Sequence, residues 1–212
     1  SNTQMGGWFR KEVKTLEDLK GLKFRIPGFG GEILARIGVI PQSIAASDVY
    51  SALERGTIDA TEFIGPYDDE KLGFQEVAPY YYVPGFAEGA ANLSFYVNKD
   101  AWQSLPPLYQ EIFEVASVEA HQWMTAQYDA KNPAALATLI KNGAKLRSFS
   151  TEILQAAYDA AQEIDAEESA NNPDFKKIYE HWKAFHHQEY QWFRVNENLF
   201  QQFMYKKLRA QR

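Results

Sequence analysis

Cysteine is absent from the 212 residues, which excludes disulfides, thiolate metal sites and cysteine nucleophiles. No apolar run approaches the ~18 residues that a membrane-spanning helix needs. Basic residues are also in deficit: the net charge is -6 and the pI is near 5.3, so nucleic-acid binding is not expected. The hydrophobic fraction of 45% is nevertheless sufficient for a buried core.

The N-terminus lacks the charged region and following apolar run of a secretory signal. The chain is therefore either cytosolic, or its first residue is not the start of the gene. The opening stretch from Ser1 to Trp8 contains no initiator methionine and resembles the interior of a protein. We therefore expect a truncated or processed chain.

Recognised catalytic motifs are missing as well. No HExxH, Gly-x-Ser-x-Gly or P-loop pattern occurs. The adjacent His186 and His187 would point to different sides of a helix, so we expect packing or surface roles for them, as for His121 and His181. Residues 28–31, Gly-Phe-Gly-Gly, lie between a predicted strand and a predicted helix. Such a junction can present backbone N–H groups to an anion, but a simple turn is the favoured interpretation.

The first hundred residues alternate between short strands and short helices. Gly and Pro separate these elements, and a half-buried alternation of side chains marks the fourth strand. This order predicts an α/β layer with a mostly parallel sheet. The predicted strands are residues 23–26, 58–64, 80–83 and 91–98, and the predicted helices are residues 16–20, 32–37, 48–55 and 68–72.

The second half of the chain is predicted to be largely helical. Proline opens a helix at residue 107, separates it from a second helix at Pro133, and opens a last helix at Pro173. One further strand is expected at residues 144–148. The predicted helices are residues 107–131, 133–141, 150–170 and 173–207.

The last predicted helix is too aromatic for a fully solvated one. Its aromatic side chains include Trp182, Phe185, Trp192, Phe200 and Phe203. It either lies across the body of the protein or docks on a partner subunit, because large apolar patches mark interfaces. Periodicity does not separate these two hypotheses.

Polar side chains stand at the ends of predicted strands, where α/β folds place their ligands. Arg25 ends one strand, Glu62 lies near the end of another, and Glu88 lies in a turn-rich loop before a third. An arginine suits two-point capture of a carboxylate, and two converging glutamates need a proton or a hard cation between them. Spacing alone favours ordinary surface roles for all three.

Longer stretches of the sequence resemble a known family. Residues 15–26, Thr-Leu-Glu-Asp-Leu-Lys-Gly-Leu-Lys-Phe-Arg-Ile, are similar to a hallmark of TRAP-transporter solute-binding proteins, the DctP family. Residues 38–42 and 48–60 resemble its second hallmark. Residues 4–9, 62–69 and 78–82 look like the branch of this family that binds 2-oxo acids such as pyruvate.

The resemblance implies a binding site. It favours binding roles over ordinary surface roles for Arg25, Glu62 and Glu88. Arg25 falls on the position that clamps the ligand carboxylate, and the cation in that branch is typically Na⁺ or Ca²⁺. Trp8, Phe63 and Phe86 would exclude water around the ligand. The implied cation ligands are the side chains of Gln4, Glu62 and Glu88 and the backbone carbonyl of Phe63. Relatives commonly carry Trp at position 63, so Phe63 changes the wall of the pocket.

The resemblance also implies a fold, a location and partners. We expect a lobe like that of a type II periplasmic binding protein, with a largely helical C-terminal half and a long C-terminal helix. The expected division is residues 1–100 for part of the α/β lobe, 101–172 for its completion and hinge, and 173–212 for a helix that can form a homodimer. The expected location is the periplasm, and the expected partners are a small carboxylic acid and the TRAP membrane permease subunits.

Family members are longer, and their cleft lies between two lobes, so this chain is expected to keep one lobe and part of the site. We expect a binding protein rather than an enzyme. The first alternative is a hydrolase that uses Glu62 and Glu88 as an acid–base pair. The second is an oligomerising fragment that binds no ligand.

Overall fold

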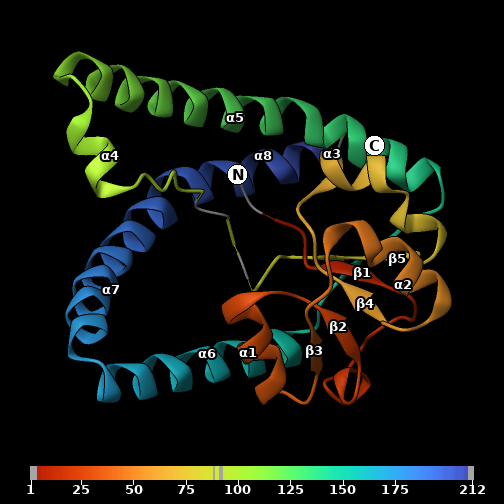
Figure 1. The fold of residues 1–212 in the computed structure, drawn as a ribbon. Coiled ribbons are helices and arrows are strands. Elements are labelled where there is room, and N and C mark those ends of the chain that lie inside the picture. Colours follow the sequence, from red (N-terminus) through yellow and green to blue (C-terminus); the bar gives the residue numbers. More distant parts are fainter. Residues whose placement is uncertain (1–3, 88, 91–92, 210–212) are drawn as a thin grey trace. The chain divides into compact units, whose positions relative to one another are not determined.

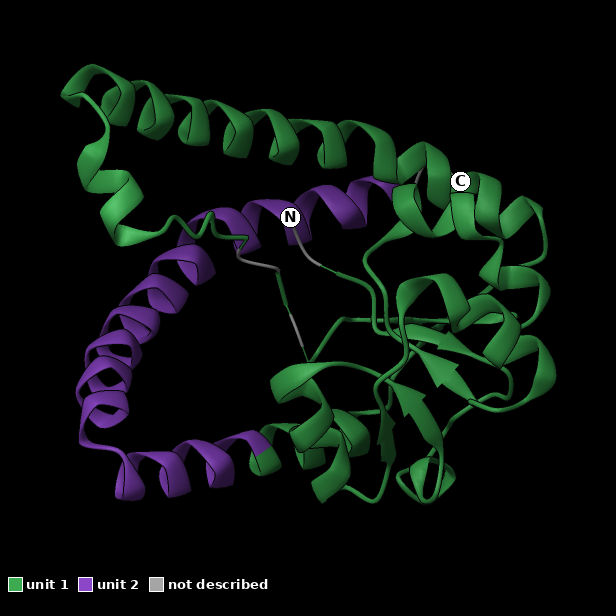
Figure 2. Cartoon of the chain, in the orientation of Figure 1, with its two compact units in different colours: residues 1–160 green, residues 161–212 purple. Residues whose placement is uncertain are grey.

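The fold comes from a computed structural model that describes residues 4–87, 89–90 and 93–209. The chain divides into two compact units, residues 1–160 and residues 161–212 (Figure 2). The first unit holds the sheet and the helices around it, and the described residues of the second are helical except Asn172, between α6 and α7 (Figure 1). No helix in the described ranges is both long and apolar enough to cross a membrane.

The first unit is built on a six-stranded sheet with the order β3-β2-β4-β1-β5-β6. β2 pairs in parallel with β3 and β4, and β5 pairs in parallel with β6, whereas the central β1 is antiparallel to both of its neighbours. The expected mostly parallel sheet is therefore confirmed, with one reversed strand at its centre. The bounds are β1 Gly7–Phe9, β2 Lys23–Arg25, β3 Ile40–Gln42, β4 Ala60–Thr61, β5 Tyr80–Val83 and β6 Lys145–Ser148.

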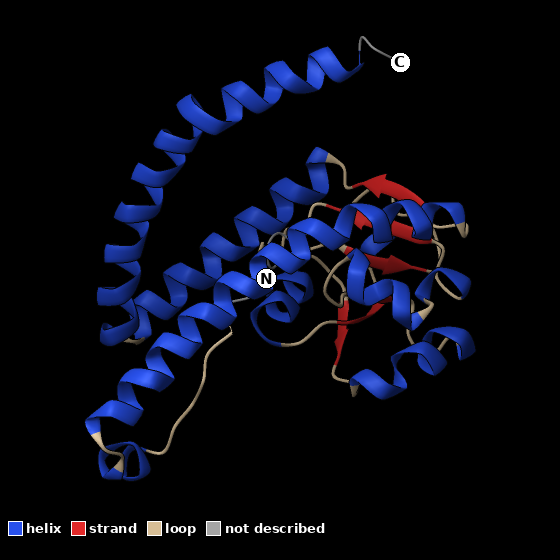
Figure 3. Cartoon of the chain, turned by 90° about the horizontal axis from the view of Figure 1, so that it is seen from above, coloured by secondary structure: helices blue, strands red, loops and turns tan. Residues whose placement is uncertain are grey.

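Helices follow the strands and make up most of the rest of the chain (Figure 3). Short 3₁₀ turns cover residues 17–19, 46–48, 70–72 and 74–76, and a π-helical turn covers residues 194–198. The bounds are α1 Gly28–Arg36, α2 Val49–Arg55, α3 Pro66–Asp69, α4 Lys99–Ser104, α5 Pro107–Lys141, α6 Thr151–Asn171, α7 Pro173–Phe193 and α8 Leu199–Arg209.

The central strands of the sheet are buried on both faces. Neighbouring residues of a strand point to opposite faces, and each face has its own hydrophobic cluster. Phe9 and Tyr82 join one hydrophobic cluster, whereas Trp8 and Tyr81 join the other. The two clusters therefore meet at β1 and β5. Just before β1, Gly6 lies so close to the ring of Phe149 and the carbonyl of Pro84 that no side chain fits there.

Two predicted helices form one. α5 continues through Pro133, which the sequence analysis expected to separate two helices. A proline inside a helix removes one backbone hydrogen bond and clashes with the preceding turn. The turns after Pro133 are held by tertiary packing, because Ala135 and Leu139 are buried there. Burial thus outweighs the local preference for a break.

The strand predicted at residues 91–98 is wrong for its described part. Residues 93–98 have no regular structure, and Leu93, Phe95 and Tyr96 are exposed by 71%, 69% and 95%. Alternation of apolar and polar side chains indicates a segment with two different faces. A strand also needs a neighbouring strand to which its backbone can hydrogen-bond. No strand of the described residues pairs with this segment. Residues 91 and 92 lie outside the described ranges.

Two local predictions at turns also need correction. The turn predicted at residues 28–31 is confirmed at its first residue, because Gly28 has a positive φ of 61°, but α1 already begins at Gly28 instead of at residue 32. A Cβ at Gly30 would lie 2.9 Å from the end of the Ile26 side chain and 3.2 Å from the side chain of Ala87, so these neighbours would have to shift to admit it. The predicted helix at 16–20 is a 3₁₀ turn without a side-chain cap, and Thr15 donates to the Asp18 carboxylate instead of capping the turn.

Asp69, the last residue of α3, is an acidic side chain inside the core, with 1% of its surface exposed. One carboxylate oxygen accepts hydrogen bonds from the Trp8 indole at 2.9 Å and the Tyr81 hydroxyl at 2.7 Å. The other oxygen accepts from the backbone N–H of Ile64 at 3.4 Å. Burial raises the pKa of Asp69 to about 6, although these three donors favour the charged form. Burial beside Asp69 also raises the pKa of Tyr81, which therefore remains a donor.

The raised pKa of Asp69 predicts a pH dependence of stability. Its native pKa of about 6 lies above the ordinary 3.8, so the folded state binds this proton more tightly than the unfolded chain. The favourable contribution of Asp69 to the free energy of unfolding is complete below about pH 4, and it is lost as the pH rises through about 6. Each unit of pKa shift corresponds to about 1.4 kcal/mol, so the free energy of unfolding should fall by on the order of 3 kcal/mol.

Urea unfolding of the wild type and Asp69→Asn between pH 4 and 7 measures this effect. Asn does not titrate, so the free energy of unfolding of the wild type, relative to that of the variant, should fall across this range. Parallel pH profiles for the two proteins would contradict the prediction.

Candidate functional site

The predicted site residues Arg25 and Glu62 meet at one edge of the sheet. Arg25 ends β2, and Glu62 directly follows β4, the parallel neighbour of β2. In this register Arg25 lies opposite Thr61, and the backbone N–H of Glu62 donates to the carbonyl of Arg25 at 3.1 Å. The carboxyl ends of parallel strands are where α/β sheets place ligands.

The guanidinium of Arg25 is half-buried and held by backbone oxygens. Its Nη1 donates to the carbonyl of Glu62 at 3.1 Å, and its Nε donates to the carbonyl of Ile44 at 3.3 Å. Its central carbon lies 5.9 Å from the centre of the Phe63 ring, within the range of a cation–π contact. These contacts orient a permanent positive charge beside Glu62.

Gln4 and Glu62 are both buried, each with 6% of its surface exposed. The chain before β1 carries Gln4 to this edge, where its carbonyl accepts from the N–H of Gly85 at 3.2 Å. The Oε1 atom of Gln4 is buried and accepts no hydrogen bond within the described part of the chain. A buried amide oxygen without a donor costs free energy, and a hard cation would supply the missing positive partner. The amide oxygen of Gln4 and the carboxylate of Glu62 are oxygen ligands of the type that Na⁺ and Ca²⁺ prefer.

The aromatic residues predicted to line the pocket lie in three different settings. Phe86 is half-buried and packs edge-on against Phe149, with ring centres 4.9 Å apart. Phe63 is half-buried and packs edge-on against Phe74 at 5.7 Å. Trp8 has no exposed surface and stacks on Tyr81 inside the core.

Glu88, the remaining predicted cation ligand, lies outside the described residues. Among the residues that are described, no three His, Asp or Glu side chains are grouped so that they could hold a metal ion. The predicted set differs from such a group, because it uses the amide of Gln4 and the carbonyl of Phe63. It stays a prediction.

A small cleft lies at this edge, with an accessible volume of only about 10 Å³, which is room for about one water molecule. Its walls are mostly apolar, and the Glu62 side chain is the one acidic group among the lining residues described. An apolar wall with a few placed polar groups is typical of small-molecule sites. The lining residues are Met5, Gly6, Phe24, Ile26, Leu34, Glu62, Gly85, Phe86 and Ala87.

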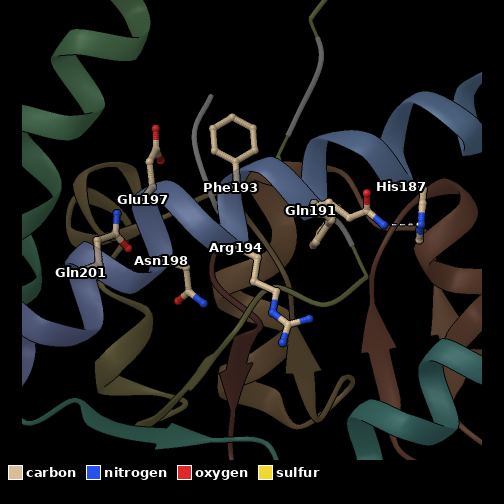
Figure 4. A pocket seen from close by; sticks show the side chains of 8 residues that line it. His187, Gln191, Phe193, Arg194, Glu197, Asn198 and Gln201 are labelled. Carbon is tan, nitrogen blue, oxygen red and sulfur yellow. Dashed lines mark hydrogen bonds between the residues drawn. The ribbon is translucent and has the colours of Figure 1, made fainter.

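A second hollow lies on the C-terminal unit (Figure 4). Its lining residues all belong to consecutive turns from α7 through the π-helical turn into α8, so the wall comes from a single run of helix. His187 and Gln191 form a hydrogen bond of 2.8 Å at one end of it. A wall of this kind does not enclose a small molecule. The exposed side chains there suit a flat contact instead.

Two contributors to the site were missed by the sequence analysis. The carbonyl of Ile44 orients Arg25, and a backbone acceptor leaves no mark in the sequence. Asp69 anchors the N–H of Ile64 beside the site. Asp69 is buried and its neighbour Asp68 is less buried, although both are aspartates. The residue type therefore does not show which of the two lies in the core.

Similar solved structures share this fold. A TRAP transporter solute-binding protein from Bordetella bronchiseptica RB50 is 51% identical, with a TM-score of 0.92 over 99% of this chain and 62% of that one. It is described as a mixed-occupancy dimer with calcium and picolinate bound. The one from Colwellia psychrerythraea has calcium and pyruvate bound and is 40% identical, with a TM-score of 0.90 over 94% of this chain and 61% of that one.

Sequence relatives agree with the structural ones. A monocarboxylate 2-oxoacid-binding periplasmic protein of Nostoc sp. strain PCC 7120 is 49% identical over 96% of this chain. The chain spans 56% of the length of that relative. The model of the family described as bacterial extracellular solute-binding protein, family 7, matches residues 1–171. The chain therefore belongs to the DctP family of TRAP solute-binding proteins.

Proposed function

We propose that this chain carries the carboxylate- and cation-binding part of a solute-binding protein for a small 2-oxo acid such as pyruvate. The observation that carries the proposal is the edge where Arg25 and Glu62 meet beside the buried Gln4. Arg25 would hold the ligand carboxylate by charge-assisted hydrogen bonds. Phe63 and Phe86 would cover its apolar part.

The same proposal assigns a cation, Na⁺ or Ca²⁺, to this edge. When bound, the ion would neutralise the glutamates and attract the anionic ligand. Its ligands would be the side chains of Gln4, Glu62 and Glu88 and the carbonyl of Phe63. The buried Oε1 of Gln4 supports this assignment, as do the calcium and sodium bound in similar structures with pyruvate.

The family supplies the context for this function. Its members are solute-binding transport proteins rather than enzymes, so the hydrolase alternative for Glu62 and Glu88 receives no support. The proposed location is the periplasm, as in the name of the Nostoc relative. The proposed partners are the TRAP membrane permease subunits, to which the protein would deliver its ligand.

Thermal unfolding of this chain with pyruvate, in the presence and absence of Na⁺ or Ca²⁺, tests the site. A ligand at about 100 times its Kd stabilises the folded state by ~2.7 kcal/mol, which gives a clear shift in Tm. We expect a shift that depends on the cation. We also expect Arg25→Ala to weaken pyruvate binding at least about tenfold, because a charge-assisted hydrogen bond contributes about 1.5–3 kcal/mol.

The matched control is Arg55→Ala, at an exposed arginine of α2 whose side chain bonds only to Ser51 among the hydrogen bonds described for it. This variant should keep the wild-type shift. If the wild-type chain shows no shift with pyruvate, longer 2-oxo acids or either cation, the proposal fails for this chain. The fragment hypothesis, in which the chain only oligomerises, would then be preferred.

We also propose that the C-terminal unit pairs with a second copy of the chain. Its aromatic residues remain exposed: Trp182 by 49%, Phe185 by 57% and Trp192 by 57%. Rings of α7 stack in series along one face, from Phe175 through Tyr179 to Trp182. The Bordetella relative, which matches 99% of this chain, is described as a dimer.

Sedimentation equilibrium of this chain should detect a dimer. The double variant Trp182→Ala/Trp192→Ala should weaken the dimer at least about tenfold, since buried interface tryptophans each contribute 2 kcal/mol or more. Trp123→Ala removes a tryptophan of α5 that is exposed by 65%, and it should leave the dimer intact. Equal dissociation in both variants would argue against pairing through the C-terminal unit.

A further inference from the structure

The three segments that carry the proposed site converge on one buried side chain that does not line the cleft. Asp69 accepts hydrogen bonds from Trp8, Tyr81 and the N–H of Ile64. Its carboxylate is almost wholly buried, and the residues around the cleft do not include it. Asp69 therefore reaches the site only through its neighbours.

Each donor to Asp69 belongs to a segment with a proposed ligand contact. Trp8 lies in β1, four residues after Gln4. Ile64 directly follows Glu62 and Phe63 in the chain. Tyr81 lies in β5, which leads into the loop with Phe86. A single carboxylate thus joins the three segments on which the proposed cation ligands lie.

The segment from Glu62 to Ile64 lies beyond the regular ladder of β4 and is held by a few separate hydrogen bonds. β4 ends at Thr61, so the ladder hydrogen bonds stop before the segment begins. Glu62 is still linked to Arg25 of β2, by its N–H to the Arg25 carbonyl and by its carbonyl to the Arg25 guanidinium. Beyond it, Ile64 is held on one side by its carbonyl, which accepts from the Met5 N–H at 3.2 Å, and on the other by Asp69.

The turn after this segment is tied to Asp69 as well. The backbone N–H of Asp69 donates to the carbonyl of Gly65 at 2.9 Å, which closes the turn into α3. On the outer side of α3, the N–H of Tyr67 donates to the side chain of Asn132 on α5 at 3.0 Å. α3 is therefore fixed from within by Asp69 and from outside by Asn132.

We propose that Asp69 is a positioning residue that holds the Glu62–Phe63 segment, β1 and β5 in the arrangement that binds the cation and the carboxylate. This inference rests on the proposed function of the site. A carboxylate suits the role because it accepts hydrogen bonds on both oxygens. Asn has nearly the same shape but only one acceptor oxygen, so Asp69→Asn turns an N–H₂ group towards at least one of the donors.

Amide hydrogen exchange of this chain at pH 7 tests the proposal without any ligand. Asp69→Asn should speed exchange at Ile64 and Met5 at least tenfold more than at amides of β2 and β3. Leu19→Ala is the matched control, because Leu19 is buried in the other cluster, away from Asp69. Leu19→Ala should lower Tm by a similar amount, but it should not speed amide exchange selectively at Ile64 and Met5. Asn132→Ala removes only the outer anchor of α3 and should have a smaller effect at Ile64.

Titration with Ca²⁺ alone, followed by pyruvate, gives the second readout. Asp69→Asn should raise the Kd for Ca²⁺ at least tenfold, whereas Leu19→Ala should leave it within about twofold of the wild type. Equal exchange patterns in the two variants, or equal cation affinities, would overturn the positioning role. If the wild type binds neither Ca²⁺ nor pyruvate, the proposed function fails, and the exchange pattern alone decides whether Asp69 fixes this segment.

Discussion

The pairing of β1 with both of its neighbours is the contact on which the first unit depends. β1 is antiparallel to β4 on one side and to β5 on the other, and without it the sheet would divide into β3-β2-β4 and β5-β6. Its two aromatic residues, Trp8 and Phe9, enter opposite hydrophobic clusters. The same strand brings Gln4 to the edge where Arg25 and Glu62 meet. Core formation and site assembly therefore share one element.

Most elements of the fold could be predicted from local patterns. The strands at 23–25, 80–83 and 145–148 and the helix at 151–171 lie close to their expected positions, because Gly and Pro mark their ends. Predictions failed where distant contacts decide the outcome. Pro133 stays inside α5 because later turns are buried, and residues 93–98 remain irregular because no described strand pairs with them. Neither a buried face nor a pairing neighbour is visible in a short window of sequence.

The residues of the candidate site could be predicted from the sequence, but the residues that hold them in place could not. Resemblance to the family indicated Arg25, Glu62 and Gln4, and the structure brings these three to one edge, while their binding roles remain proposals. Trp8 was expected at the pocket, yet it lies in the core and donates to Asp69. Asp69 itself gave no signal, because its burial depends on Tyr81 and Trp8, which are distant in sequence. Residues that touch a ligand are marked by shared motifs, whereas residues that hold them are found only in three dimensions.

The close contact between Gly6 and Phe149 has a consequence for how the protein is made. The ring of Phe149 closes over Gly6, and the neighbouring β6 completes the sheet beside β5. Both partners lie far downstream of β1, so the ribosome must release residues beyond 149 before this corner can close. Until then, the aromatic strands β1 and β5 remain only partly covered on the nascent chain. Such exposed strands are targets for aggregation and for chaperones during synthesis.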